Sequence, residues 1–196
     1  MKNSFNYIIV GLLILLTVSS CSRKKDRFIN RSWHAVNTKY NVLFNGNIAL
    51  ESGKNDVITA YKDNYWEILP VERLQISDAI VLDDKAKNSS IELAEVKAVK
   101  AIQKHGMNIK GKEKNPQIDE AYMLLGKARY FDNRFIPALE AFNYILFKYP
   151  ASSNINLAKI WRAKTNIRLQ NEDVAIQNLK KLIELEKLSK YDIVEA

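Results

Sequence analysis

The chain has little of the chemistry that disulfide-stabilised folds, metal sites and common enzyme families require. Its single cysteine, Cys21, excludes a disulfide within the chain, so packing alone must hold the fold. Its two histidines, His34 and His105, lie in separate predicted helices, and no Cys/His cluster is left to bind zinc. The sequence also lacks a Gly-rich phosphate loop and a Gly-x-Ser-x-Gly elbow. These absences predict a protein that is not an enzyme and that uses no cofactor or metal.

Glycine and proline are scarce as well, with six and four copies, which disfavours a turn-rich β-sandwich. Strand-like alternation of apolar and polar residues is not sustained anywhere, whereas apolar residues recur at helical spacing over several segments. The 47% of hydrophobic residues is ordinary for a globular protein and allows a real core. The expected fold class is therefore all-α.

The amino-terminal segment has the layout of a secretory signal peptide. Lys2 supplies the charged start, an apolar run of 11 residues covers residues 8–18, and Ser19 and Ser20 precede Cys21. Small residues before a cysteine resemble a bacterial lipobox, in which the chain is cut between Ser20 and Cys21 and the thiol is acylated. An uncleaved membrane anchor is the alternative, but it needs about 20 apolar residues. We therefore expect residues 1–20 to be a signal peptide and Cys21 to carry lipid.

The mature chain would be basic. Removal of residues 1–20 takes away Lys2 and no acidic residue, which leaves a formal charge of +7. Export and a membrane tether argue against nucleic acid as a partner, and no small-molecule substrate is indicated. In one run Glu113 is the only acidic residue among five lysines: Lys100, Lys104, Lys110, Lys112 and Lys114. Such a run is typical of a solvated helix end and loop, and it also has the charge to dock on anionic lipid or an acidic partner.

Residues 21–27 are polar and are expected to form a lipidated tether, followed by a helical amino-terminal region over residues 28–109. Apolar spacing predicts a helix over residues 33–50, a stop at Gly53, and another helical pattern over residues 57–68.

A further helix is predicted to start at Ser89, which stands three residues before Glu92 as in a capping box. It should end at His105 and Gly106, because glycine can adopt the left-handed conformation of a helix cap. Residues 110–117 are expected to form a basic, polar linker.

The clearest motif lies within residues 118–196, which are expected to form TPR-like helical hairpins. The following residues fall at the spacing of the roughly 34-residue tetratricopeptide (TPR) repeat: Tyr122, Leu125, Gly126, Ala138, Phe142 and Pro150. Gly126 and Ala138 are small because the two helices of a repeat cross closely at these positions. A second, degenerate copy follows at an offset of 37 residues, with its matching positions at Ala163, Ala175 and Leu179.

An upstream copy departs further from the pattern. The segment from Tyr40 to Gly46, followed by Gly53, resembles a first TPR helix and its turn, but Ile58 stands where the second helix needs a small residue. About three stacked repeats usually suffice for a shared core. The chain stops eight residues into a further helix that starts at Ser189, so we expect a fragment of a longer protein.

A TPR array presents a concave groove lined by the first helix of each repeat. Side chains expected to face it are Met123, Lys127 and Tyr130 in one repeat and Ile160, Lys164 and Ile167 in the next. Basic, aromatic and apolar groups together suit an extended peptide or a partner helix with acidic residues. Alternatively, Tyr130 and Ile167 simply pack against neighbouring hairpins, as such stripes often do.

Three strings resemble one family when they are taken together with the lipobox and the TPR pattern. They are the Asn-Gly-Asn string of residues 39–47, the Trp-Glu-Ile-Leu-Pro string of residues 65–71, and the segment 104–122. They resemble the amino-terminal part of the SprE/PorW lipoproteins of Bacteroidota, over about residues 21–185. The resemblance implies a non-catalytic scaffold that binds other proteins and supports type IX protein secretion and gliding motility.

The same resemblance implies partners and a location. Members of that family are longer than this chain and are associated with the ring and the outer-membrane translocon of the secretion machine, which would be the partners. The implied location is the outer membrane, with the lipid on Cys21 as anchor and the protein facing the periplasm. Basic residues directly after the cysteine, Arg23 to Lys25, favour that face, because surface-exported lipoproteins of this phylum tend to be acidic there.

Two other classes stay open. A TPR lipoprotein could serve as an assembly factor for outer-membrane barrel proteins, and binding of unfolded barrel carboxy-terminal segments would indicate this class. A cell-wall-binding module or enzyme would instead bind or release muropeptides. Co-purification with a stable set of secretion proteins would indicate the scaffold.

Replacing the lipidated cysteine tests the lipoprotein interpretation. Cys21→Ala is expected to release the protein from the membrane and to weaken its function, because the lipid keeps the chain at a raised local concentration. The fold should persist, since the thiol forms no disulfide. Membrane fractionation and circular dichroism check this, with lost membrane association and an unchanged helical signal as the expected result. A variant that stays membrane-bound would contradict the interpretation.

Overall fold

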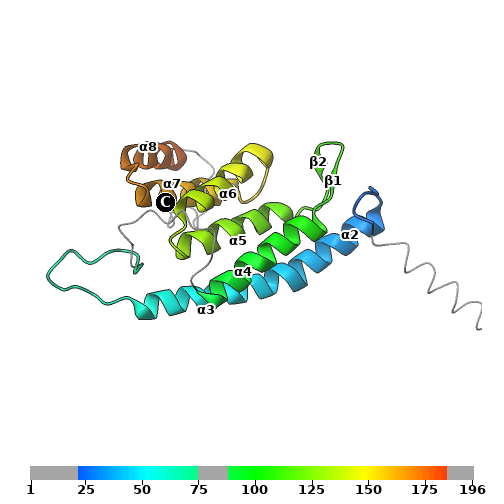
Figure 1. Ribbon diagram of the computed structural model, residues 1–196. Coiled ribbons are helices and arrows are strands. Elements are labelled where there is room, and N and C mark those ends of the chain that lie inside the picture. Colours follow the sequence, from blue (N-terminus) through cyan, green and yellow to red (C-terminus); the bar gives the residue numbers. More distant parts are fainter. Residues whose placement is uncertain (1–21, 75–87, 185–196) are drawn as a thin grey trace, which may run out of the picture.

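The computed structural model describes residues 22–74 and 88–184, and these ranges are mostly helical (Figure 1). The signal peptide, Cys21 and the helix expected from Ser189 lie outside the described residues. Within the described ranges the expected all-α class is confirmed, apart from one short two-stranded hairpin. No helix in these ranges is both long enough and apolar enough to cross a bilayer.

The first described helices form one long, unbroken helical path from Phe28 to Ala60. It consists of α2 (Phe28–Asn37), a π-helical turn η1 (Thr38–Leu43) and α3 (Phe44–Ala60). Later, α4 (Ser89–Lys100) is extended by a second π-helical turn, η2 (Ala101–His105). The remaining elements are the strands β1 (Asn108–Ile109) and β2 (Lys112–Glu113) and the helices α5 (Ile118–Phe131), α6 (Phe135–Lys148), α7 (Ile155–Arg168) and α8 (Glu172–Ile183).

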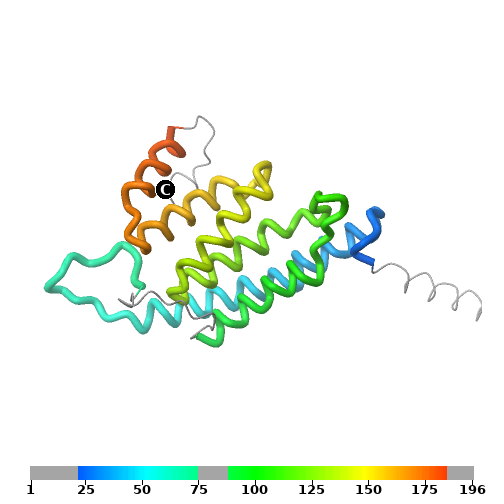
Figure 2. The backbone as a smooth tube through the Cα atoms, turned by 45° about the horizontal axis from the view of Figure 1, so that its top comes forward, coloured from blue at the N-terminus to red at the C-terminus, as the bar shows by residue number. Residues whose placement is uncertain are grey.

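Helices that follow one another in sequence are neighbours in space. Each helix from α3 to α7 packs on the next one, and α5 also touches α3 and α7. Figures 1 and 2 show a row of helices in which α2 and α3 form one edge and α7 and α8 lie toward the other. One apolar core runs between these helices, from Leu43 and Leu50 to Phe142 and Trp161. No described helix covers the outer side of α2 and α3.

The long helix approaches its neighbours closely at two glycines. A Cβ atom on Gly46 would lie 2.6 Å from Leu124 Cδ2. A Cβ atom on Gly53 would lie 2.5 Å from Ile91 Cγ1. Both distances are too short for a side chain, so glycine is needed for helices to pack at this spacing. The stop predicted at Gly53 is therefore wrong, because this glycine is a packing position inside α3.

The helix predicted over residues 57–68 is also wrong. α3 ends at Ala60, and residues 61–74, which we call the strap, continue without helix. The helix that packs along α3 is α4, in which Ala94 and Ala98 are fully buried. The small residues that are missing around Ile58 are therefore supplied by a helix that starts later in the chain.

α4 begins with a different cap from the one predicted. The side chain of Asn88, and not that of Ser89, accepts hydrogen bonds from the backbone N–H groups of Ser90 (2.8 Å) and Ile91 (3.1 Å). Asparagine is among the preferred residues for this position, because its side-chain oxygen satisfies N–H groups that the first turn leaves unpaired.

The end of this helical segment agrees with the prediction in position but not in conformation. η2 ends at His105, and Gly106 follows with a φ of −61°, which is not left-handed. A Cβ atom on Gly106 would lie 2.5 Å from the carbonyl oxygen of Ile102. Close backbone contact, and not a positive φ, therefore accounts for glycine here.

The segment predicted as a linker over residues 110–117 contains part of a tight hairpin. Lys110 (φ 52°) and Gly111 (φ 78°) form its two-residue turn, and two positive φ values are typical of a type I′ turn. The Glu113 carboxylate accepts three backbone hydrogen bonds at 2.7–3.0 Å, from the N–H groups of Met107, Lys114 and Asn115. The basic run therefore ends in a fixed turn.

Residues expected to pack within the TPR-like hairpins lie in the core or at its margin. A Cβ atom on Gly126 would lie 2.4 Å from Phe142 Cε1, so α5 and α6 cross closely at this glycine. Tyr122 stacks on Tyr144 with 4.3 Å between the ring centroids. Leu179 is half-buried and Pro150 is exposed, whereas the other members are buried: Leu125, Ala138, Phe142, Ala163 and Ala175.

A buried ionic network joins α4 to the turn between α5 and α6. The Arg134 side chain is fully buried, and its Nε donates to Asp132 Oδ2 at 2.8 Å. Arg134 also donates to Glu95 of α4, which in turn accepts from Arg129 Nε at 2.8 Å. Burial alone would raise the pKa of Glu95, but the two arginines hold that pKa below its usual range. The buried charges are thus compensated by one another.

Removing the central arginine should destabilise the fold. Arg134→Ala is expected to lower the free energy of unfolding by about 3–5 kcal/mol, because it removes a buried charged partner of Asp132 and one of the two arginines that pair with Glu95. Urea denaturation at neutral pH measures the change. Arg31→Ala is the control, because Arg31 pairs with Asp26 at 3.5 Å near the surface and should contribute less than about 1 kcal/mol. Equal losses for both variants would contradict a central role of the network.

Candidate functional site

A carboxyl group of the strap is held by side chains of α5 and α7. Glu72 Oε2 accepts hydrogen bonds from the Tyr130 hydroxyl at 2.5 Å and from Arg168 Nη2 at 2.8 Å. Lys164 Nζ lies 3.3 Å from Glu72 Oε1, and Arg168 Nε donates to the Tyr130 hydroxyl at 3.0 Å. Donors from two helices therefore converge on one carboxyl group. We call Tyr130, Lys164 and Arg168 the carboxylate site.

Helix geometry explains why these donors share one surface. Lys164 and Arg168 are four residues apart on α7, and this spacing places both side chains on the same face of a helix. Tyr130 belongs to the last turn of α5, which contacts α7. The site is thus built on two rigid helices, and its ligand comes from a segment 96 residues away from Arg168 in the sequence.

An aromatic cluster supports the carboxylate site. Trp161, which precedes Lys164 by three residues, packs edge-on against Tyr130 with 5.3 Å between ring centroids. The ammonium groups of Lys127 and Lys164 lie 5.0 and 4.5 Å from the centre of the Trp161 ring. Cation–π contacts of this kind contribute about 0.5–2 kcal/mol each. The contact of Lys164 holds the ammonium group that pairs with Glu72 against the aromatic cluster.

The electrostatics of the site favour an ionised Glu72 at neutral pH. Burial alone would raise the pKa of Glu72, but hydrogen bonds from Tyr130 and Arg168 and the charges of Lys164 and Arg168 hold that pKa below its usual range. Burial and the neighbouring negative charge of Glu72 raise the pKa of Tyr130. The tyrosine therefore stays protonated, and its hydroxyl group donates a hydrogen bond to the carboxylate.

The strap is closed at its base and exposed at its tip. Arg73 donates to both carboxylate oxygens of Asp63, from Nε at 3.2 Å and from Nη2 at 3.0 Å. Leu74 is buried in the core, next to these charges. Four large apolar side chains between Asp63 and Arg73 are at least 80% exposed: Tyr65, Trp66, Ile68 and Val71. Apolar side chains exposed together in this way are typical of protein interaction sites.

The six groove residues predicted from the sequence have different environments. Tyr130 and Lys164 contact the Glu72 carboxylate, and Lys127 lies over the Trp161 ring. Met123 and Ile160 are buried between helices and are not open to a partner, whereas Ile167 is 42% exposed. Tyr130 is expected from the sequence either to face the groove or to pack against a neighbouring hairpin. Its ring packs in the core, and its hydroxyl group contacts Glu72.

Sequence reasoning missed Glu72, Trp161 and Arg168. The sequence carried a signal for Arg168, because the spacing of four residues from Lys164 predicts a shared helix face. No periodic pattern connects Glu72 with α7. Its role follows only from the path of the strap across the folded helices.

The two histidines, expected in separate helices, are brought together by the fold. His34 Nδ1 and His105 Nδ1 are 3.2 Å apart, at the contact between α2 and η2. Burial, together with the charges of His34, Lys100 and Lys104, lowers the pKa of His105. The contact links α2 to η2.

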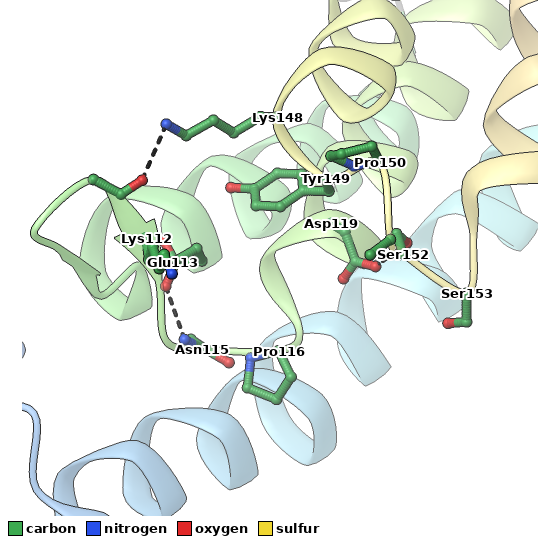
Figure 3. Close-up of a pocket in the computed structure, with 12 residues that line it drawn as sticks. Lys112, Glu113, Asn115, Pro116, Asp119, Lys148, Tyr149, Pro150, Ser152 and Ser153 are labelled. Atoms are coloured by element: carbon green, nitrogen blue, oxygen red, sulfur yellow. Dashed lines mark hydrogen bonds between the residues drawn. The ribbon is translucent and has the colours of Figure 1, made fainter.

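A hollow lies between the hairpin, the start of α5 and the turn after α6 (Figure 3). Asp119 accepts hydrogen bonds there from Ser152 Oγ and, at 3.4 Å, from Asn154 Nδ2. Lys148 Nζ donates to the Gly111 carbonyl oxygen at 3.4 Å. These polar groups tie neighbouring turns together. The described residues contain no group of three or more His, Cys, Asp or Glu side chains that could hold a metal ion.

No protein-family model matches this chain, and no curated protein matches its sequence.

Neutralising the bound carboxylate should loosen the strap. Glu72→Gln is expected to lower the free energy of unfolding by about 1–2 kcal/mol at pH 7, because it removes charge-assisted hydrogen bonds at a partly exposed site. Because the folded-state pKa is lowered, this stabilisation is complete above the unfolded pKa of about 4.3 and disappears as the pH falls through the folded-state pKa. Urea denaturation of both proteins between neutral and acidic pH measures it.

Glu67→Gln is the matched control, because Glu67 belongs to the same strap and makes no ion pair with a described residue. A loss of stability in Glu67→Gln equal to that in Glu72→Gln would show that the carboxylate site does not fasten the strap. A difference between Glu72→Gln and the parent protein that persists unchanged in acid would lead to the same conclusion.

Proposed function

We propose that this protein is a non-catalytic lipoprotein scaffold that binds other proteins through TPR-like helical hairpins. One observation carries the proposal: the surface of α5 and α7 binds an acidic, non-helical segment of chain through Tyr130, Lys164 and Arg168. This is the ligand class that the predicted groove residues favour. A surface that binds such a segment within the chain has the chemistry to bind a similar one from a partner.

The TPR-like part of the proposal rests on the way that two helix pairs cross. In the α5–α6 pair, Gly126 faces Phe142, and Ala138 is fully buried. In the α7–α8 pair, the matching positions are Ala163 and Ala175, both buried. Small residues at equivalent places in successive hairpins support a repeated unit.

The partner-binding surface is proposed to include the strap as well as the helices. The apolar tip of the strap is exposed and its base is fixed by Asp63–Arg73 and Glu72, so it presents apolar side chains on a defined support. Ile167 adds an exposed apolar side chain on α7, one residue before Arg168. Fixing a loop before binding lowers the entropy that is lost on association.

The cellular role rests on the sequence resemblance to SprE/PorW lipoproteins. We propose that the chain supports type IX secretion and gliding motility, that its partners are ring and translocon components, and that lipid on Cys21 anchors it in the outer membrane facing the periplasm. The row of helices supports this role, because a rigid support suits a protein that holds other proteins at fixed positions.

A crosslinked pulldown from the native envelope tests this proposal. The full-length protein is expected to enrich ring and translocon components of the secretion machine, as identified by mass spectrometry. Ile167→Ser should reduce that enrichment several-fold, because partly exposed apolar anchors often dominate binding. Ile176→Ser is the matched control, since Ile176 is 47% exposed on α8, away from the carboxylate site.

The alternatives give different results. Enrichment of barrel-assembly proteins would favour an assembly factor for outer-membrane barrels. Enrichment of no envelope protein, or equal losses for Ile167→Ser and Ile176→Ser, would contradict binding through this surface.

A further inference from the structure

A stripe of large apolar side chains runs along the outer edge of the molecule. It occupies one face of α2, η1 and α3, and its members are 51–69% exposed: Ile29, Trp33, Val36, Tyr40, Phe44 and Ile48. Successive members are three or four residues apart, which is the spacing of one helix face. We call these six residues the outer stripe.

The outer stripe is not a by-product of core packing. The opposite face of the same helical path already supplies the core, through Val42, Leu43, Ala49 and Leu50. Figures 1 and 2 both place α2 and α3 at the margin of the row of helices. A helix that is apolar on two faces needs two apolar neighbours, and the described fold supplies only one. Large exposed apolar patches mark interaction sites with proteins or membranes.

Charge distinguishes the kind of neighbour. Residues 22–50 contain six Lys or Arg residues and a single acidic residue, Asp26. That residue is paired, since Arg31 and Lys114 lie 3.5 and 3.1 Å from its carboxylate oxygens. The segment therefore has an excess of positive charge beside an apolar stripe that contains Trp33 and Tyr40. Basic residues next to an apolar face with aromatic side chains are typical of helices that lie in a membrane interface.

Continuity with the tether points to the same neighbour. The helical path begins at Phe28, seven residues after Cys21, and the intervening residues 22–27 are polar and basic. Arg23 donates to the Gln103 carbonyl oxygen, so the tether lies against the end of η2 and starts beside α2. A lipid on Cys21 would hold this end of the helix at the membrane surface.

We propose that the outer stripe lies flat on the anionic membrane surface into which the lipid of Cys21 inserts. Ile29, Trp33, Tyr40, Phe44 and Ile48 would enter the boundary between head groups and acyl chains, and the basic residues of the tether would contact lipid phosphates. The inference rests on the lipid anchor that is part of the proposed function. It also agrees with the release that we expect for Cys21→Ala, because the stripe would bind strongly only when the lipid keeps it close to the surface.

This contact would fix the orientation of the whole array. The path from Phe28 to Ala60 spans 33 residues, or about 50 Å of helix at 1.5 Å per residue. The tether lies at one end of this path, and the strap starts at the other. A single lipid at Cys21 would let the array swing freely, whereas the outer stripe would hold α3 parallel to the surface and keep the strap near the membrane.

Site-directed labelling tests the contact, because the native chain has no thiol other than Cys21, which the lipid occupies. Single cysteines replace Tyr40 or Ile48 in the stripe, and Phe147, which is 84% exposed on α6, serves as control. An environment-sensitive fluorophore is attached to each lipidated full-length protein, which is reconstituted in vesicles containing phosphatidylglycerol. We expect blue-shifted emission and quenching by doxyl-labelled lipids at positions 40 and 48, and neither effect at position 147.

Two further comparisons separate the stripe from other contacts. Trp33→Ser with Phe44→Ser should abolish the quenching at position 40, and unchanged circular dichroism would show that the fold persists. Vesicles of phosphatidylcholine alone should give weaker quenching, because the basic residues then lack anionic lipid.

Several outcomes would overturn the proposal. Equal solvent exposure at positions 40 and 147 in vesicles would show that the stripe does not touch lipid. Lipid contact at Lys110→Cys, without contact at position 48, would show that the molecule stands on its basic hairpin. Protection of position 40 that persists in detergent and grows with protein concentration would show that a second copy covers the stripe. None of these measurements involves a secretion component. A negative labelling result would therefore overturn the membrane contact without affecting the result of the pulldown. Absence of lipid on Cys21, read by mass spectrometry, would instead remove the anchor of the proposed function.

Discussion

Close approach of helices at glycine is the constraint on which this fold depends. At Gly46, Gly53 and Gly126 a single methyl group would overlap atoms of the facing helix. The buried alanines of α4, Ala94 and Ala98, extend this seam of small residues. Helices packed this closely exclude water and form one core, which must hold a chain that has no disulfide. The row of helices then fixes the positions of Glu95, Arg129, Lys164 and Arg168.

Two ionic arrangements use these positions in different ways. The network around Arg134 is buried and ties α4 to the turn between α5 and α6, so it belongs to the stability of the fold. The carboxylate site around Glu72 lies nearer the surface and holds the strap, which is not helical. The first arrangement is part of the core, whereas the second positions a surface element. This difference is why the carboxylate site, and not the more buried network, is the candidate for partner binding.

The surface proposed to contact the membrane and the surface proposed to bind a partner lie on different parts of the molecule. The outer stripe lies on α2, η1 and α3, directly after the tether, whereas the carboxylate site lies on α5 and α7 and holds the strap that follows α3. A scaffold at a membrane needs both a fixed orientation and an accessible partner surface. The long helix connects the two, because it begins beside the tether and ends where the strap starts.

Local patterns in the sequence determined the helical class, the hairpins at Gly126 and Ala138, and two of the three side chains of the carboxylate site, Tyr130 and Lys164, because helical periodicity and small crossing residues act over a few turns. They failed at Gly53 and at residues 57–68, where a glycine needed for packing has the same appearance as one that ends a helix. Only the tertiary structure decided that α4 is the partner of α3, that His34 meets His105, and that Glu72 fills the site on α5 and α7. Those contacts join residues that are far apart in the chain. Local spacing predicts which side chains share a helix face, but it does not predict which distant side chain will meet that face in the fold.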